Sequence, residues 1–337
     1  MLDVNFNQII EMIEKRKNNA YRKVNEEMIL LYLEVGKFLY ELKETSGYGD
    51  KITTKAADFM KDNYPAIKGF TKRNIERMIQ FYSTYKDDEI ATPLVTQLSW
   101  TNNLLILSGS KTEGERHFYL QLSIKNNYSK RELDRQITSS YYERYMLSYG
   151  KQLPTTNKTI DEDDYPNTRI LDTYSLEFLD LPNEYTEKDL KNAIIKNLKD
   201  FILEVGKDFT FIGDEYRVQV GNHDFFIDLL FYNRELSCLV AFELKLGEFK
   251  AEYLGKMNLY LEALDRDVKK AQENPSVGII LCSSKDKDVV EYSLSKNMSQ
   301  TLISEYKLKL IDKKLLETKL KEMKALIEND SEEKNDD

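Results

Sequence analysis

Three ionisable residues interrupt two apolar segments of the chain. Asp228 lies inside FFIDLLFY, and Glu243 and Lys245 lie inside LVAFELK. Both segments are rich in the aromatic and branched residues that favour β-strands. A charge inside such a strand needs a reason, and charged groups clustered in a pocket often mark a functional site. These three residues are therefore the first candidates for chemistry.

The residues between the two segments predict an antiparallel hairpin. The apolar pattern breaks at residues 233–236, and the simplest register then pairs Asp228 with Ala241. Side chains alternate faces along a strand, so Glu243 and Lys245 share a face with Asp228. In this register Asp228 and Glu243 are diagonal neighbours, roughly 7–8 Å apart at the backbone. Their side chains can close that gap onto one shared ion.

Two carboxylates beside an ammonium group indicate metal-assisted hydrolysis. A hard cation such as Mg2+, or Mn2+ in its place, takes oxygen ligands, and Asp228 and Glu243 are a sufficient protein contribution. Lys245 would position or help deprotonate the attacking water and offset negative charge on a phosphate oxygen. The alternative is a structural salt-bridge network on a solvent-facing sheet. The other residues expected on this face are largely apolar, which favours a pocket.

The spacing of these residues resembles the PD-(D/E)xK nuclease signature, in which Asp228 is followed fifteen positions later by Glu243-Leu244-Lys245. The surrounding segments resemble the YhcG-type PD-(D/E)xK nucleases, which carry a helical N-terminal domain before the nuclease domain. The segments with this resemblance are YGDKITTKAADF, KGFTKRNIERMIQFY, LSW, YSKRELDRQI, FILEVGKDFTFIGDEYRVQV, FFIDLLFYN and FELKLGEFKAEYLGKMNLYLEALDR. The resemblance covers most of the chain and implies a restriction-endonuclease-like domain.

A helix is expected before the hairpin. Thr186 and Asp189 form an N-terminal capping pattern, and apolar residues at helical spacing continue to Gly206. Glu204 lies in the last turn, where an acid opposes the helix dipole. By the resemblance, Glu204 matches the acid that many PD-(D/E)xK nucleases carry on their first helix, where it orients water at the metal. Glu204 is therefore a fourth candidate catalytic residue.

Another helix is expected after the hairpin, from about residue 250 to residue 264. Lys256 and Tyr260 lie one turn apart on it and share a face. Nuclease relatives often carry Gln and Tyr at these places, so Lys256 departs from the family pattern. By the resemblance, both residues are candidates to contact the scissile phosphate or its neighbour.

The composition favours an ordered globular protein with two domains. The chain has 337 residues, 41% of them hydrophobic, and a net charge of −9. Residues 1–150 carry 22 basic and 20 acidic side chains, so the overall acidity argues only mildly against nucleic-acid binding. With two histidines, a zinc site or histidine catalysis is not expected, and Cys238 and Cys282 are expected to be small buried residues.

The first 148 residues are expected to form a helical domain. Thr71 should cap a helix through KRNIERMIQFYSTY, and the helix and glycine-containing turn before it resemble a helix-turn-helix. Lys72, Arg73 and Arg77 fall outside the apolar stripe of this helix and are the candidate DNA contacts. The alternative is the solvated face of an ordinary helical bundle.

The rest of the chain is expected to form an α/β domain, which gives an α+β protein overall. Residues 149–167 combine two prolines with a run of acids and are expected to be a linker. Strands and helices alternate over residues 168–327, which predicts a mixed central sheet flanked by helices. Residues 328–337 are expected to be a disordered acidic tail.

The leading prediction is a Mg2+-dependent endonuclease that hydrolyses DNA. A homodimer is expected by analogy, because cutting both strands takes two sites. One alternative is a DNA-binding or interaction protein whose nuclease fold is a weakly active or inactive platform. Another is a hydrolase of a smaller phosphate ester, although the chain has no glycine-rich phosphate loop. No signal peptide or apolar run of transmembrane length is evident, so a cytoplasmic protein is expected.

Overall fold

Apolar residues at helical spacing fold the first part of the chain into helices. The computed structural model describes residues 7–46, 51–148, 170–295 and 300–333. It divides the chain into two units, Met1–Ile137 and Thr138–Asp337. The expected linker at residues 149–167 lies outside the described residues.

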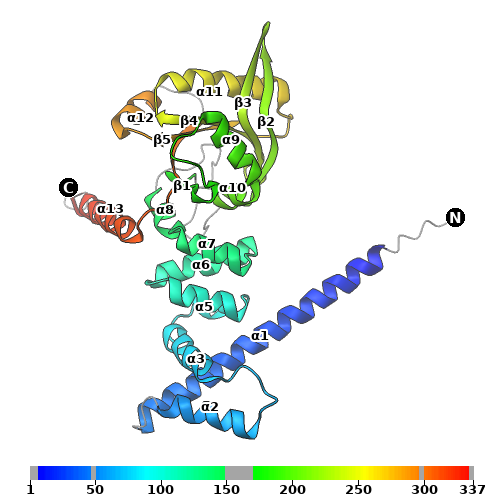
Figure 1. Ribbon diagram of the computed structural model, residues 1–337, viewed down its shortest axis with the longest axis vertical. Helices are drawn as coiled ribbons and strands as arrows, with labels where there is room; N and C mark the ends of the chain where they lie inside the picture. The colour runs from blue at the N-terminus through cyan, green and yellow to red at the C-terminus, as the bar shows by residue number, and fades with distance from the viewer. Residues whose placement is uncertain (1–6, 47–50, 149–169, 296–299, 334–337) are drawn as a thin grey trace, which may run out of the picture. The chain divides into compact units, whose positions relative to one another are not determined.

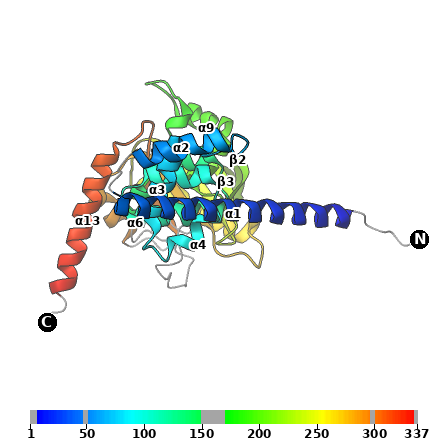
Figure 2. The same cartoon turned by 90° about the horizontal axis from the view of Figure 1, so that it is seen from below.

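The first unit is helical, as expected (Figure 1). Its helices are α1 Asn7–Ser46, α2 Lys51–Asn63, α3 Lys72–Tyr85, α4 Ala91–Val95, α5 Trp100–Gly109, α6 Glu113–Asn126 and α7 Lys130–Thr138. The Thr71 hydroxyl accepts the Asn74 amide hydrogen, which confirms the expected cap of α3. Helix α3 packs closely on α1, since a Cβ added at Gly36 would meet the backbone of Met78. Figure 2 shows α1 continuing well past α2 and α3 toward its N-terminal end.

The second unit contains a six-stranded mixed sheet. Its strands are β1 Thr173–Ser175, β2 Phe209–Val220, β3 His223–Asn233, β4 Cys238–Glu248, β5 Val277–Ser284 and β6 Thr301–Lys307. The strand order is β1-β6-β5-β4-β3-β2. Strands β2, β3 and β4 pair antiparallel, whereas β4, β5, β6 and β1 pair parallel. The mixed sheet expected from the sequence is therefore confirmed.

Helices α11 and α10 cover the two faces of this sheet. The helices of the second unit are α8 Tyr141–Leu147, α9 Glu187–Lys196, α10 Leu198–Val205, α11 Glu252–Ala263, α12 Lys287–Leu294 and α13 Lys313–Glu333. Met257 of α11 packs in one apolar cluster with Leu230 and Ala241. On the opposite face, the Phe201 ring of α10 lies 5.7 Å from that of Phe242. Figure 1 shows α11 and α10 on the two sides of β4.

The two ends of the second unit differ from the sequence-based expectation. Contacts divide the chain after Ile137, so α8, expected in the helical domain, groups with the second unit and packs against α13. Helix α13 continues to Glu333. The prediction of a disordered tail from residue 328 was therefore wrong over residues 328–333. Residues 334–337 lie outside the described residues.

The β3–β4 hairpin has a register two residues away from the expected one. Leu230, not Asp228, pairs with Ala241, and the ladder closes at Asn233↔Cys238. The reason lies in the turn. The Asn233 side chain accepts the Leu236 amide hydrogen at 3.0 Å, and Ser237 takes a left-handed φ of 50° as the last turn residue. Asn233 therefore stays in the strand, and the turn is shifted along the chain.

The expected helix from Thr186 to Gly206 is two helices. The Thr186–Asp189 capping box is present, which confirms the predicted start of α9. The chain breaks at Asn197, whose backbone leaves the helical region at φ −109° and ψ 32° and whose side chain donates to the Ala193 carbonyl. Asn and Asp side chains compete for helix backbone groups in this way. The break separates α9 from α10.

Other general expectations can be compared with the described residues. Cys238 and Cys282 are buried and free, as predicted. None of the helices in the described ranges combines the length and apolar character that a membrane span needs.

Candidate active site

Asp228 and Glu243 lie on the adjacent strands β3 and β4. The ladder pairs Leu229 with Phe242, so continuing it by one residue places Asp228 opposite Glu243. Here the Leu244 amide donates its hydrogen bond to the Asp228 side chain, at 2.8 Å from Oδ2, and not to a backbone carbonyl of β3. The two carboxylates are thus direct cross-strand neighbours, closer than the diagonal pair expected from the sequence.

Glu243 is buried, with 1% of its side chain exposed. Its Oε1 accepts from Lys256 Nζ at 2.6 Å and from Lys245 Nζ at 3.0 Å. Its Oε2 is buried and has no hydrogen-bond partner among the described residues. Because an unsatisfied buried carboxylate oxygen is costly, this atom marks a place for a ligand.

Asp228 is held in an unfavourable environment for its charge. Burial raises the pKa of its carboxyl above the ordinary value, and the neighbouring Glu243 carboxylate raises it further. The Leu244 amide and the ammonium groups of Lys245 and Lys256 act in the opposite direction but do not cancel these effects. A cation between the two carboxylates would remove the repulsion, so the donor set fits a hard divalent ion.

Lys245 is enclosed by acids. Its Nζ lies 3.0 Å from Glu243 and 3.2 Å from Glu187 Oε2, and it sits 5.5 Å from the centre of the Tyr253 ring. Burial alone would lower the pKa of Lys245, but Glu243 and Glu187 outweigh burial and raise it. Lys245 is therefore a firmly charged ammonium beside the carboxylate pair.

Glu187 is the site residue that sequence reasoning missed. It lies in the first turn of α9, directly after the Thr186 cap, and half of its side chain is exposed. Its position 58 residues before Lys245 gives no local signal of their contact. The capping pattern locates the helix start and so identifies Glu187 as a first-turn acid. Only the packing of α9 near β4 shows what that acid touches.

Comparisons with known proteins agree over nearly the whole chain. Residues 167–321 match the YhcG PDDEXK nuclease domain, and residues 8–144 match the DUF1016 N-terminal domain. The Escherichia coli (strain K12) protein named "Putative nuclease YhcG" is 30% identical over 353 residues, which cover 95% of this chain and 94% of that protein. The chain belongs to the YhcG family.

Solved structures give a weaker likeness to this YhcG-family chain. A repair endonuclease from Pyrococcus abyssi has a TM-score of 0.26 at 17% identity, covering 39% of this chain and 50% of that one. The structure of an EndoMS–dsDNA2 complex has a TM-score of 0.27 with the same identity and coverage. The matched part is thus half of each solved chain, and the family assignment rests on the sequence matches.

The structure does not bring Glu204 to the carboxylate pair of this YhcG-family site. Glu204 is fully buried, forms an ion pair with Arg144, and accepts the Ser175 amide hydrogen at 2.7 Å. Ser175 belongs to β1, and strands β6 and β5 lie between β1 and β4. The predicted role of Glu204 at the metal is therefore not supported, because its carboxylate is directed to edge strand β1.

Lys256 and Tyr260 have different surroundings. Lys256 reaches Glu243 and remains 46% exposed, so it is both close to the site and accessible. Tyr260 is completely buried, and its hydroxyl donates to the Phe226 carbonyl at 2.5 Å. A direct phosphate contact by Tyr260, expected from the sequence, does not fit this burial. Its hydrogen bond instead fixes α11 to strand β3.

The three basic residues of α3 lie outside its apolar stripe, as predicted. Lys72 and Arg73 are exposed, and Lys72 lies 3.9 Å from Glu76. Arg77 is half-buried and donates to the neutral side chain of Gln80 at 3.1 Å. Their contact with DNA stays a prediction.

A separate group of possible metal ligands lies in the first unit. Asp88, Glu113 and His117 each place one ligand atom within 4.8 Å of the others. His117 Nε2 already lies 2.7 Å from Asp88 Oδ2, and Asp88 Oδ1 accepts the Ala91 amide hydrogen at 2.8 Å. These two interactions give Asp88 a structural role, because they link α6 to the start of α4.

Proposed function

We propose that this protein is a metal-dependent endonuclease that hydrolyses DNA phosphodiester bonds. The observation that carries the proposal is the buried Oε2 of Glu243 beside Asp228, which has no hydrogen-bond partner in the described ranges, with the Lys245 ammonium 3.0 Å from the other Glu243 oxygen. The PDDEXK nuclease domain that the chain contains supports the same reaction class.

Asp228 and Glu243 would hold a divalent cation, with Mg2+ as the first candidate and Mn2+ as a substitute. When bound, such an ion polarises the phosphate and makes water a stronger nucleophile. Lys245 then supplies a fixed positive charge at the phosphate, held in place by Glu187 and Glu243. The Leu244 amide holds the Asp228 carboxylate in orientation.

The proposal can be tested by cleavage assays on linear duplex, branched and single-stranded DNA, with RNA as a comparison. Each substrate is incubated with the full chain in Mg2+, in Mn2+ or in EDTA. Cutting that requires a divalent ion and prefers one DNA form is expected. If the folded protein binds DNA but cuts none of these substrates in either metal, the inactive-platform alternative replaces the proposal.

A homodimer is the assembly we propose for duplex cleavage, since two sites are needed to cut both strands. Sedimentation of the full chain with and without duplex DNA tests this part separately. A monomer in both states, together with double-strand cutting, would contradict it.

Replacing Lys256 by Gln should strengthen metal binding. The Lys256 ammonium lies 2.6 Å from Glu243 and therefore repels a cation bound to the same carboxylate. Removing that charge should lower the Kd for Mn2+ by several-fold to about tenfold, a range that allows for the exposure of Lys256. Isothermal titration with Mn2+ measures this change. Lys250→Gln, just before α11, is a control that should leave the Kd unchanged.

Replacing Glu187 by Gln should shift the basic side of the pH–rate profile. Glu187 raises the pKa of Lys245, so its loss lowers that pKa and the ammonium deprotonates at lower pH. Activity should then decline at lower pH than in the wild type. At neutral pH the rate should fall by no more than about fivefold, because a half-exposed pair contributes at most about 1 kcal/mol. An unchanged basic limb would show that Glu187 does not act through Lys245.

A further inference from the structure

Two adjoining cavities in the first unit form one groove. Their volumes are about 580 Å³ and about 430 Å³. Thr101 and Lys130 line both, so the cavities lie next to each other. We call this feature the α5 groove and define it by its four basic residues, Arg22, Arg73, Arg77 and Lys130.

The α5 groove has a one-sided charge. Its two cavities are lined entirely by described residues, none of which is acidic. Two acids near the groove have other partners, since Glu76 lies 3.9 Å from Lys72 and Glu132 accepts the Ser129 amide hydrogen at 2.8 Å. Basic side chains gathered without acids create a positive potential that attracts anions.

Three helices begin at this groove and add to its positive character. Thr71 precedes α3, Ser99 precedes α5, and Ser129 precedes α7; all three residues are among those that line the cavities. The N-terminal end of a helix carries partial positive charge from its unpaired amide groups. The helix starts and the basic side chains therefore act in the same direction.

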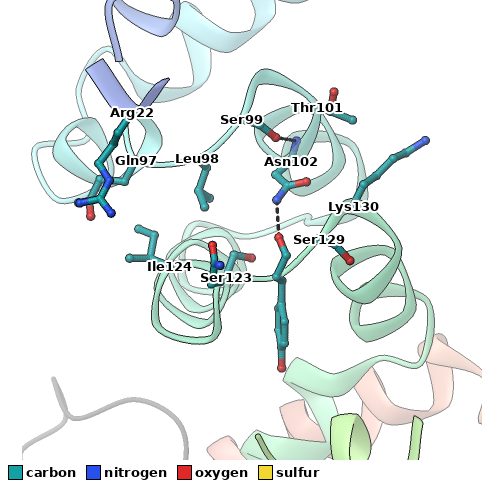
Figure 3. Close-up of a pocket in the computed structure, with 12 residues that line it drawn as sticks. Arg22, Gln97, Leu98, Ser99, Thr101, Asn102, Ser123, Ile124, Ser129 and Lys130 are labelled. Carbon is teal, nitrogen blue, oxygen red and sulfur yellow. Dashed lines mark hydrogen bonds between the residues drawn. The ribbon is translucent and has the colours of Figure 1, made fainter. Parts of the chain in front are cut away.

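One buried hydroxyl in the groove has no hydrogen-bond partner in the part of the chain that the structure describes. Ser123 is 1% exposed, and its Oγ forms no hydrogen bond within the described residues. Figure 3 shows Ser123 on the α6 wall of the larger cavity, with Arg22 and Lys130 on opposite sides. A buried hydroxyl that faces a cavity gains a hydrogen bond when a polar ligand enters.

We propose that the α5 groove binds the phosphodiester backbone of DNA. The basic groups are spread along two adjoining cavities, which suits a chain of phosphates better than a single small anion. The lining of the larger cavity includes serine, threonine and asparagine side chains of the kind that contact phosphate and sugar. This inference rests on the proposed nuclease function and names where its substrate is held on the helical unit.

The α5 groove differs from a helix-turn-helix contact in one testable respect. Arg73 and Arg77 line the groove, but the adjacent Lys72 lines a separate cavity next to α2. Arg22 and Lys130 belong to other helices and have no place in a recognition helix of α3. Lys72 and Lys130 therefore separate the two modes of binding.

DNA binding by the full chain in EDTA provides the test, because no cleavage is then expected. Anisotropy of a labelled 30-base-pair duplex is measured over a range of KCl concentrations for Arg22→Gln/Lys130→Gln. The Kd should rise about tenfold at low salt, and the slope of log Kd against log salt should fall by about 2, one per lost phosphate contact. All the substituted side chains are exposed, so circular dichroism should show an unchanged fold.

The matched control is Lys37→Gln/Lys61→Gln, which removes the same charge from exposed positions outside the groove. This control should change Kd less than twofold, and Lys72→Gln is measured separately as the recognition-helix variant. If both double variants bind the duplex equally weakly, the groove is not a specific site. The same conclusion follows if the groove variant binds with wild-type affinity. Weakening by Lys72→Gln without weakening by the groove variant would support α3 as a recognition helix instead. If low-millimolar inorganic phosphate displaces the duplex at constant ionic strength, the groove is a site for a small anion and not for DNA.

Cleavage assays on the same variants separate this inference from the nuclease proposal. With saturating DNA and Mg2+, the groove variant should cut at the wild-type rate, because its active site is intact. If it binds and cuts like the wild type at every DNA concentration, the groove proposal fails and the nuclease stands. If the wild type binds through the groove but cuts nothing, the nuclease proposal fails alone.

Discussion

Replacing Asp228 by Asn should reduce DNA cleavage on the order of a thousandfold or more while DNA binding is kept. Asn preserves the shape of the side chain and can still accept the Leu244 amide hydrogen. It removes one of the two negative charges that would hold the cation. The loss should therefore appear in kcat at saturating DNA, with little change in the Kd measured in EDTA.

The same change should not destabilise the metal-free protein. Burial and Glu243 raise the folded-state pKa of Asp228, so its ionisation weakens the folded state as pH rises through the unfolded and then the folded pKa. This cost is present in the wild type above the folded-state pKa and absent in Asp228→Asn. Calorimetry in EDTA should give a Tm at or above that of the wild type.

Added Mg2+ should stabilise the wild type but not Asp228→Asn. At a hundredfold excess over Kd, the ion should stabilise the wild type by about 2.7 kcal/mol and leave Asp228→Asn unchanged. Asp224→Asn is the matched control, because Asp224 lies on the same strand and pairs with Arg217 at the surface. An Asp228→Asn variant that cuts DNA at the wild-type rate would remove Asp228 from the mechanism.

Replacing Glu204 by Gln should cost about 3–5 kcal/mol of folding stability, the range found when one partner of a buried ion pair is removed. Arg144 and Glu204 are 1% and 0% exposed. Arg144 also donates to the Ser139 carbonyl at 3.0 Å and to the Thr173 carbonyl at 3.1 Å. The pair therefore joins α8 and its preceding turn to the region of β1, and Glu204→Gln leaves the buried guanidinium without its counter-charge.

The two interpretations of Glu204 give opposite results. If Glu204 is structural, denaturant melts of Glu204→Gln show the lost stability, and cleavage per folded molecule is kept. The double variant Arg144→Met/Glu204→Met should regain much of the stability, because it buries no unpaired charge. Glu215→Gln, which breaks the surface pair with Lys191, should change stability far less. Wild-type stability with lost cleavage would restore a catalytic role.

Sequence periodicity was sufficient to place Asp228, Glu243 and Lys245 on one face of a hairpin. Because side chains alternate faces with a period of two, an error of an even number of residues in the predicted register leaves each side chain on its predicted face. The register itself depended on the turn, where Asn233 remained in the strand and Ser237 took a left-handed conformation. Turn length therefore decided whether the carboxylates were diagonal or directly opposed.

The residues around the hairpin were harder to predict because their contacts are distant in sequence. Glu204 and Glu187 belong to one apolar pattern that is broken at Asn197. Glu204 then contacts edge strand β1, whereas Glu187 contacts Lys245 on central strand β4. Tyr260 shares a helix face with Lys256, yet one is buried and the other reaches the site. Helix spacing gives the face of a residue but not its depth below the surface.

The most direct test of the metal site is Mn2+ binding followed by electron paramagnetic resonance. The wild type should remove free Mn2+ signal, and Asp228→Asn and Glu243→Gln should each lose that binding. Asp88→Asn, which alters the separate Asp88, Glu113 and His117 group, should bind as the wild type does. Mn2+ binding that survives Asp228→Asn and Glu243→Gln, or that disappears in Asp88→Asn, would contradict a cation held by Asp228 and Glu243.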